Sequence, residues 1–95
     1  MVGTSRFEDA AIARKAAAMV AQGRFQYSCN ALDNSDNPGF HLKEEYKKLF
    51  GHHPWFCDFT NAQYVKSIEN DQAQARAWRV GALQLFASYL EMGVL

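Results

Sequence analysis

Histidine and cysteine side chains gather in one short segment of the chain, and these residue types bind zinc or act as nucleophiles. His52, His53 and Cys57 lie close together, and Cys29 is the other cysteine of the chain. A tetrahedral zinc site built from all four would need ligands from two separate segments. The chain contains no C-x-x-C and no H-x-x-x-H pair, which are typical metal-ligand spacings. We therefore expect no metal, and we keep a small metal- or thiol-dependent protein using these four residues as an alternative.

Catalytic patterns are otherwise weak. A cysteine nucleophile with a histidine base also needs a positioned third group and an oxyanion hole. Glu44 and Glu45 belong to the solvated face of a short predicted helix, and no Walker, Rossmann or G-x-S-x-G pattern occurs. We expect a protein that is not an enzyme and that carries no cofactor.

The polar segment that begins at Asp33 has part of the spacing of a calcium-binding EF-hand. Asp33, Ser35, Asn37 and Glu44 fall at positions one, three, five and twelve of such a loop. The sixth position must be glycine to form the sharp turn, and here it is Pro38, which cannot adopt a positive φ. We expect a polar turn instead, with Asn37-Pro38 opening the next helix.

Two aromatic residues follow the histidine pair, in a segment that Pro54 restricts. Tryptophan, tyrosine and arginine are the usual anchors of protein interfaces, so Trp55 and Phe56 suggest a surface for a partner protein. The alternative is that both rings fill the core beneath a connection between helices. The residues that we assign to partner binding are His52, His53, Trp55, Phe56 and, from the last predicted helix, Arg79.

Helix start and stop signals recur along the chain. Three capping boxes are present, in which a cap residue is followed three positions later by Glu or Gln: Ser5 with Glu8, Thr60 with Gln63, and Asp71 with Gln74. Glycines that can close a last helical turn are Gly23, Gly51 and Gly93. The predicted helices cover residues 6–22, 25–32, 38 or 41–50, 61–69 and 71–92.

No segment shows a sustained period-two alternation typical of a strand. The sequence therefore predicts an all-α fold, a compact bundle of four to five short helices in a single domain of residues 1–95. The last helix, about 71–92, is expected to be central.

The first and last predicted helices have complementary faces at 100° per residue. The first carries a broad face of small side chains, so another helix can approach it closely. The last carries a wide apolar half that we expect to be buried, and it includes Leu85 and Met92 with Trp78, Tyr89 and Phe86. Arg79 lies in the middle of that apolar half, where a guanidinium must snorkel, pair with a buried acid or contact a partner.

Charge and hydropathy exclude two further classes of function. Ten basic and ten acidic residues give no net charge and form no basic stripe, so we expect no nucleic-acid binding. No run approaches the length of a membrane span and no export signal is evident, so we expect no membrane partner, a cytoplasmic location and cysteines that remain thiols.

By elimination, the sequence favours a non-enzymatic protein–protein interaction module. Such a module would bind a larger protein as an adaptor or inhibitor, in the manner of a small accessory protein of a phage or mobile element. A structural homodimer, in which an apolar face is buried between two copies, is the remaining alternative.

Overall fold

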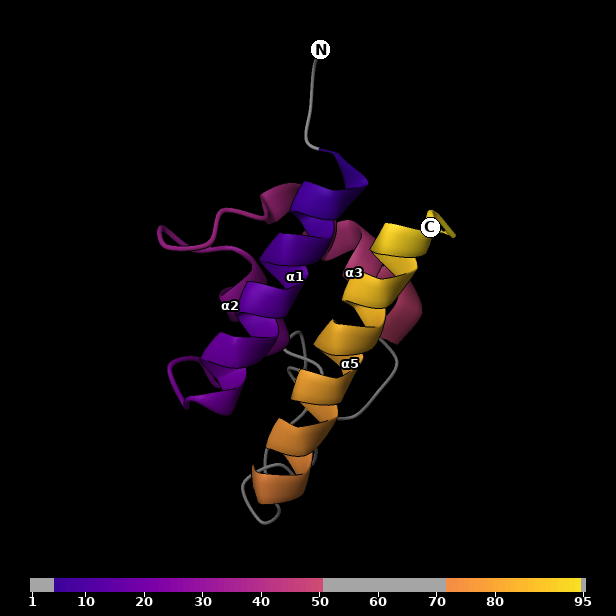
Figure 1. The fold of residues 1–95 in the computed structure, drawn as a ribbon. Helices are drawn as coiled ribbons and strands as arrows, with labels where there is room; N and C mark the ends of the chain where they lie inside the picture. The colour runs from indigo at the N-terminus through magenta and orange to yellow at the C-terminus, as the bar shows by residue number, and fades with distance from the viewer. Residues whose placement is uncertain (1–4, 51–71, 95) are drawn as a thin grey trace.

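The computed structural model describes residues 5–50 and 72–94, and the secondary-structure elements within these ranges are all helices. The elements in order are α1 (Arg6–Ala21), α2 (Ser28–Leu32), the 3-10 helix η1 (Phe40–Leu42), α3 (Lys43–Phe50) and α5 (Gln72–Met92). The described residues contain no strand, only an isolated bridge between Asn34 and Asn37. The predicted all-α fold is confirmed (Figure 1).

Helix α1 begins and ends where the sequence signals place its limits. The Ser5 hydroxyl accepts a hydrogen bond from the Glu8 amide at 3.1 Å, which satisfies a donor that the first turn leaves free. At the other end Gly23 adopts φ +77°, and the Arg24 amide donates to the Met19 carbonyl at 3.0 Å. Glycine takes this left-handed conformation at little cost and so ends the helix there.

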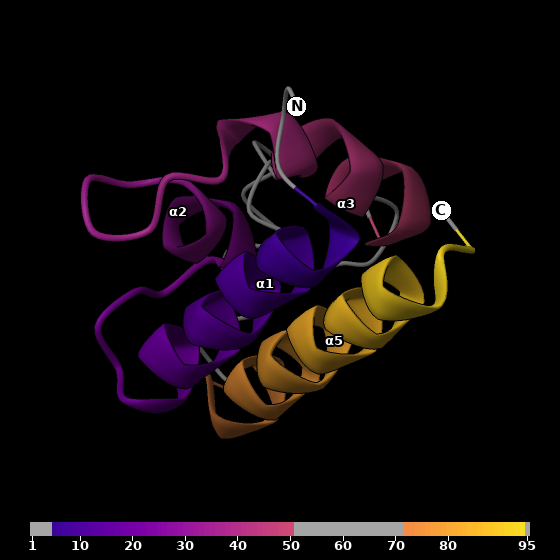
Figure 2. The ribbon, with the colours of Figure 1, turned by 45° about the horizontal axis from the view of Figure 1, so that its top comes forward.

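Helices α1 and α5 lie side by side and run antiparallel (Figure 2). Arg14 of α1 forms an ion pair of 2.6 Å with Glu91 near the end of α5, while Arg76 near the start of α5 lies beside Gly23. The buried face of α1 consists mostly of alanines, which let the two helices approach closely; its buried residues are Ala10, Ala13, Ala16, Ala17, Met19 and Val20. The predicted contact between the first and last helices is therefore confirmed.

The core contains α3 as well as α1, α2 and α5. Tyr46 of α3 is fully buried and packs edge to face on Phe86 of α5, with 5.5 Å between ring centroids. Phe50, one turn further along α3, lies 5.0 Å from the Tyr46 ring. Aromatic pairs at such separations add stability beyond the area they bury, so this contact holds α3 against α5.

The segment between α2 and α3 differs from the prediction in where the helix begins. Pro38 does not open it, because regular structure starts at Phe40. The Asn37 side chain is instead buried and donates to the carbonyl oxygens of Ile12 and Ala31, at 3.0 and 2.9 Å. Asn37 thus ties the segment to both α1 and α2, which holds it away from helical geometry.

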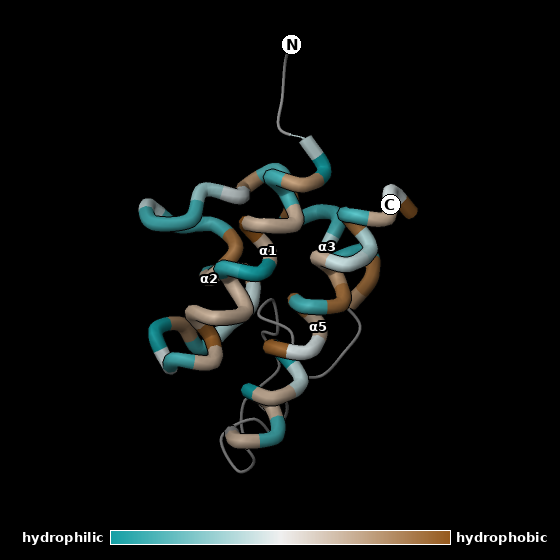
Figure 3. Tube along the Cα trace, in the orientation of Figure 1, coloured by the Kyte–Doolittle hydropathy of each residue, from teal (hydrophilic) through white to brown (hydrophobic). Residues whose placement is uncertain are grey.

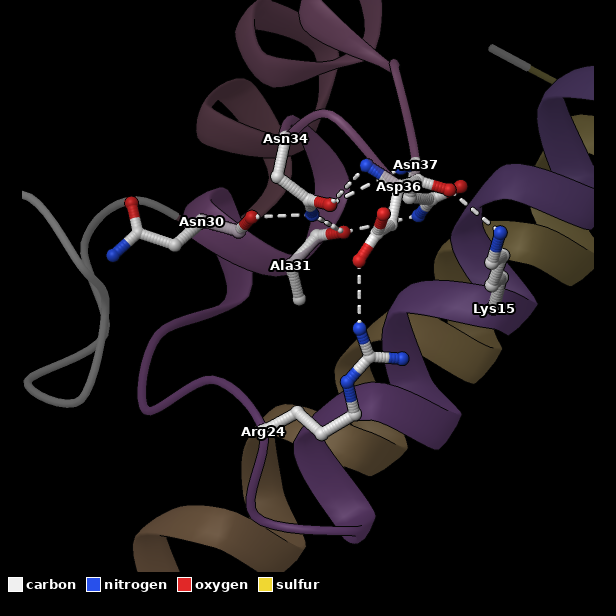
Figure 4. Close-up of polar contacts among 7 residues, drawn as sticks. All are labelled: Lys15, Arg24, Asn30, Ala31, Asn34, Asp36 and Asn37. Carbon is white, nitrogen blue, oxygen red and sulfur yellow. Dashed lines mark hydrogen bonds and ion pairs between the residues drawn. The ribbon is translucent and has the colours of Figure 1, made fainter.

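Figure 3 shows that the loop between α2 and η1 is hydrophilic over most of its length, and basic residues hold it against α1. Arg24 contacts a carboxylate oxygen of Asp36 at 2.8 Å, and Lys15 donates to the Asp36 carbonyl at 2.6 Å (Figure 4). The Asn34 side-chain oxygen accepts from the amides of Asp36 and Asn37. The predicted polar turn is confirmed, and its acidic residue serves to dock the loop.

Candidate functional site

The predicted site residues fall into two groups. His52, His53, Trp55 and Phe56 lie outside the described residues, as do Cys57 and the Thr60 and Asp71 caps. Their predicted roles stay predictions. Arg79 lies in α5, and the structure describes its surroundings.

Cys29 is buried in α2 and is disulfide-bonded. The prediction that it remains a thiol is therefore wrong, and in this state it supplies neither a thiolate nucleophile nor a zinc ligand. Residues 5–50 and 72–94 contain no group of three or more His, Cys, Asp or Glu side chains that could hold a metal ion.

Arg79 is 3% exposed, and its guanidinium carbon lies 4.9 Å from the centre of the Tyr27 ring. Burial lowers the pKa of Arg79, whereas Tyr27 and Tyr46 act to raise it. A cation over a desolvated aromatic face is attracted by the electrons of the ring. The described contacts of Arg79 are therefore internal, and its side chain presents almost no surface to a partner.

Tyr46 belongs to the same buried polar group. Burial raises the pKa of its phenol from 10.0 to about 12, because removal from water disfavours the charged phenolate. The Ser28 hydroxyl and the Arg79 charge lower the pKa of Tyr46, but by less than burial raises it. Ser28 of α2, Tyr46 of α3 and Arg79 of α5 thus form one buried polar group among the three helices.

The side of α5 that faces away from α1 differs from the prediction. The sequence assigned Leu85 and Met92 to a buried half, but they are 43% and 62% exposed. The helical wheel gives the angle of each side chain and not the position of neighbouring elements, and none of the described elements covers this angle. The exposed residues of α5 other than Arg76 can be grouped with the half-buried Ser88 as the neutral face of α5, which we define as Ala73, Gln74, Ala77, Gly81, Gln84, Leu85, Ser88 and Met92.

The eight residues of the neutral face are uncharged, and Glu91, which lies 18 residues after Ala73 at the same helical angle, borders the face at its C-terminal end with a side chain that is 40% exposed. The charges of α5 from Ala73 onward are directed elsewhere: Arg79 is buried, Arg76 lies beside Gly23, and Glu91 pairs with Arg14. The solvent side of a surface helix ordinarily carries charged and polar residues. A helix face without charge is instead typical of the centre of a protein interface.

An open apolar groove borders the neutral face where the end of α3 meets the middle of α5. It has a volume of about 250 Å³ and is lined by Phe50, Trp78, Gly81, Ala82 and Leu85. Phe50 and Trp78 pack edge to face with 5.8 Å between ring centroids, so each ring limits the movement of the other. The groove is therefore formed before anything binds to it.

Gly81 is the least expected residue of the neutral face. Glycine inside a helix costs about 1 kcal/mol relative to alanine, and a Cβ added at Gly81 would meet nothing within 4 Å. No contact within residues 5–50 and 72–94 therefore requires a glycine at that position. A glycine does allow the backbone of a second helix to come close, and this signal was readable in the sequence but was not used to predict the site.

Comparison with known proteins finds no family model, curated protein or solved structure that matches the chain. Within the described residues, no helix combines the length and the apolar character needed to cross a membrane.

Proposed function

We propose that the chain is a non-enzymatic protein–protein interaction module that receives an α-helix of a larger protein on the neutral face of α5. The observation that carries the proposal is the combination of an uncharged helix face, an open aromatic-lined groove and a glycine at its centre. Interface centres are depleted of charge and enriched in aromatic anchors, and Phe50 and Trp78 supply such anchors here. Acting as an adaptor or as an inhibitor would require the same face.

A helix is the partner element that best fits this surface. The neutral face is a straight strip rather than a closed pocket, and Gly81 lets a rod-shaped partner lie close to the α5 backbone. Leu85 projects beside Gly81 and would fit between side chains of the partner helix, as ridges fit grooves in helix packing.

The test is capture of a partner from cell extract with tagged wild-type protein and the variant Leu85→Lys. The new charge lies on the exposed edge of the groove, so folding is expected to survive while a partner is lost. Ala18→Lys, on the exposed side of α1, is the matched control and should retain the partner. Recovery of the same partner in equal amounts by all three proteins would overturn the proposal, and circular dichroism checks that each protein is folded.

The cytoplasmic location stays a prediction, and the disulfide at Cys29 weighs against it. Disulfides persist in oxidising compartments and are rare in the cytosol. Thiol labelling of the native protein with and without reductant decides whether Cys29 is oxidised. If Cys29 is labelled without reductant, it is a thiol, and the disulfide no longer weighs against a cytoplasmic location.

A further inference from the structure

The disulfide at Cys29 has few possible partners. The chain contains two cysteines, Cys29 and Cys57, and Cys29 is disulfide-bonded. We propose that Cys29 is joined to Cys57 of the same chain, and that the bond fastens α2 to the fold. Cys57 lies outside the described residues, so the proposal rests on the number of cysteines and on the surroundings of Cys29. It is independent of the neutral face of α5, so either proposal can fail alone.

The burial of Cys29 argues against a bond to another chain. Cys29 is 3% exposed, and it belongs to the hydrophobic core together with Ala31 and Leu32 of the same helix. The two Cβ atoms of a disulfide lie about 3.5–4.5 Å apart, so a cysteine of a second chain would have to enter this core. A segment of the same chain is built into the core as the chain folds. Within the chain, Cys57 is the other cysteine, and it is therefore the expected partner.

Helix α2 depends on contacts from outside the helix. It has five residues, whereas isolated helices shorter than about 12–15 residues are marginal in water. Its N-cap residue, Tyr27, makes no side-chain hydrogen bond to the first turn, which contains no acidic residue. The helix therefore draws its stability from what fastens it to the rest of the chain.

The two ends of α2 are fastened in different ways. At the C-terminal end, the Asn37 side chain donates to the Ala31 carbonyl oxygen at 2.9 Å. At the N-terminal end, the Tyr27 ring lies against the Arg79 guanidinium, and Cys29 follows two residues later. The disulfide thus supplies a covalent attachment at the end that lacks a cap.

Reduction of this bond is a thiol–disulfide exchange. A dithiol reductant attacks one sulfur as a thiolate, the S–S bond breaks, and a second attack within the reductant closes it into a cyclic disulfide. Two electrons and two protons pass to the protein, which ends with two thiols. The reduced chain loses the attachment of α2, and its unfolded state is no longer restricted by a cross-link between residues about 28 positions apart. We expect the loss to be greatest in α2.

Peptide mapping of the wild-type chain tests the pairing. Free thiols are alkylated in denaturant, and the chain is then digested with trypsin without reductant. Cleavage after lysine and arginine places Cys29 in peptide 25–43 and Cys57 in peptide 49–66. The expected product is these two peptides joined, from a chain that runs as a monomer on a non-reducing gel. Alkylated Cys29, or a cross-link between two copies, would overturn the proposal.

Hydrogen exchange tests whether the bond fastens α2. The Ala31 amide donates to the Tyr27 carbonyl and the Asp33 amide to the Cys29 carbonyl, at 3.2 and 3.1 Å, so both amides report on this helix. In Cys57→Ser, they are expected to exchange about tenfold faster or more than in the oxidised wild type. The wild type treated with a dithiol should show the same increase, whereas Cys57→Ser should not respond to the dithiol.

Helix α1 is the internal control, because its amides should keep most of their protection when the bond is absent. Unchanged exchange in α2 after confirmed loss of the bond would overturn the attachment, as would an equal increase in α1 and α2. The reduced wild type retains every residue of the chain, so it gives the result if Cys57→Ser fails to fold.

Discussion

The two sides of α5 place neighbouring large apolar residues in opposite environments. On the inner side Leu83 and Phe86 are fully buried against α1 and α3, while Leu85, next to Phe86 in the chain, is largely exposed. The inner side meets the alanine face of α1 and the ring of Tyr46, whereas the outer side meets no element of the described chain. Burial is thus decided by what lies opposite a residue, and the outer side exposes large apolar residues such as Leu85 and Met92 among small and uncharged polar ones.

The largest expected effect comes from removing a large side chain from the inner side. Phe86→Ala should lower the free energy of unfolding by about 3–5 kcal/mol, because it leaves a cavity beside Tyr46 that the helices cannot fill. Leu85→Ala, one residue away, should change it by about 0.5 kcal/mol. Urea denaturation at low protein concentration measures both, and similar losses would mean that the two sides do not differ as described.

Alkaline pH should act on the inner side alone, because the neutral face contains no titratable group. The pKa of Tyr46 is about 12 in the folded chain against 10.0 as its ordinary value. Above pH 10 the unfolded chain therefore releases the phenol proton first, and stability falls as pH rises from about 10 to about 12. The full shift corresponds to about 3 kcal/mol.

The control for this pH effect is Tyr46→Phe, which removes the titrating group and keeps the ring. If Tyr46 is the cause, the unfolding midpoint of the wild-type protein should fall between about pH 10 and about pH 12 much more steeply than that of Tyr46→Phe. The same alkaline loss in Tyr46→Phe would assign it to other groups.

Two glycines extend the comparison. At Gly39 an added Cβ would lie 2.4 Å from the Leu32 carbonyl oxygen and 2.7 Å from Ile12 Cγ2. Gly39→Ala must therefore displace backbone, and we expect it to lower the free energy of unfolding by about 1–3 kcal/mol. Thermal and urea unfolding measure the loss, and an unchanged stability would show that η1 can move away from α1 at no cost.

Gly81→Ala should have the opposite sign. Nothing crowds the added methyl group within the chain, so the monomer should gain up to about 1 kcal/mol from improved helix propensity. Gly93→Ala is the matched control, because Gly93 has φ +71° and alanine there should cost about 1–2 kcal/mol. A loss of stability in dilute Gly81→Ala would mean that the glycine serves the monomer.

Local sequence signals predicted the long helices well. A helix begins after Ser5, whose side chain caps it, and helices end at Gly23 and Gly93, which adopt positive φ. These effects are local, so they can be predicted without knowledge of the rest of the fold. The contact between α1 and α5 followed from a face of alanines, which few other arrangements can satisfy. Pro38 misled the prediction because Asn37, through bonds to α1 and α2, overrides the local preference for a helix start.

The candidate site was less predictable for a physical reason. Periodicity orders the side chains around a helix but does not show which angle lacks a neighbour, and so Leu85 was assigned to the core. Arg79 was identified as unusual, but its contact with the Tyr27 ring was not predicted, because the sequence analysis considered only a buried acid as an internal partner. The oxidation state of Cys29 depends on the three-dimensional approach of another sulfur, which residue spacing alone does not give.

The antiparallel contact of α1 and α5 also has a consequence for synthesis of the chain. Arg14 and Glu91 are 77 residues apart, and a ribosome adds about 5–20 residues per second. The alanine face of α1 therefore waits about 4–15 s for the helix that covers it. Because a face of alanines offers little apolar surface to other chains, α1 is suited to that interval, and the bulky residues that complete the core arrive last, on α5.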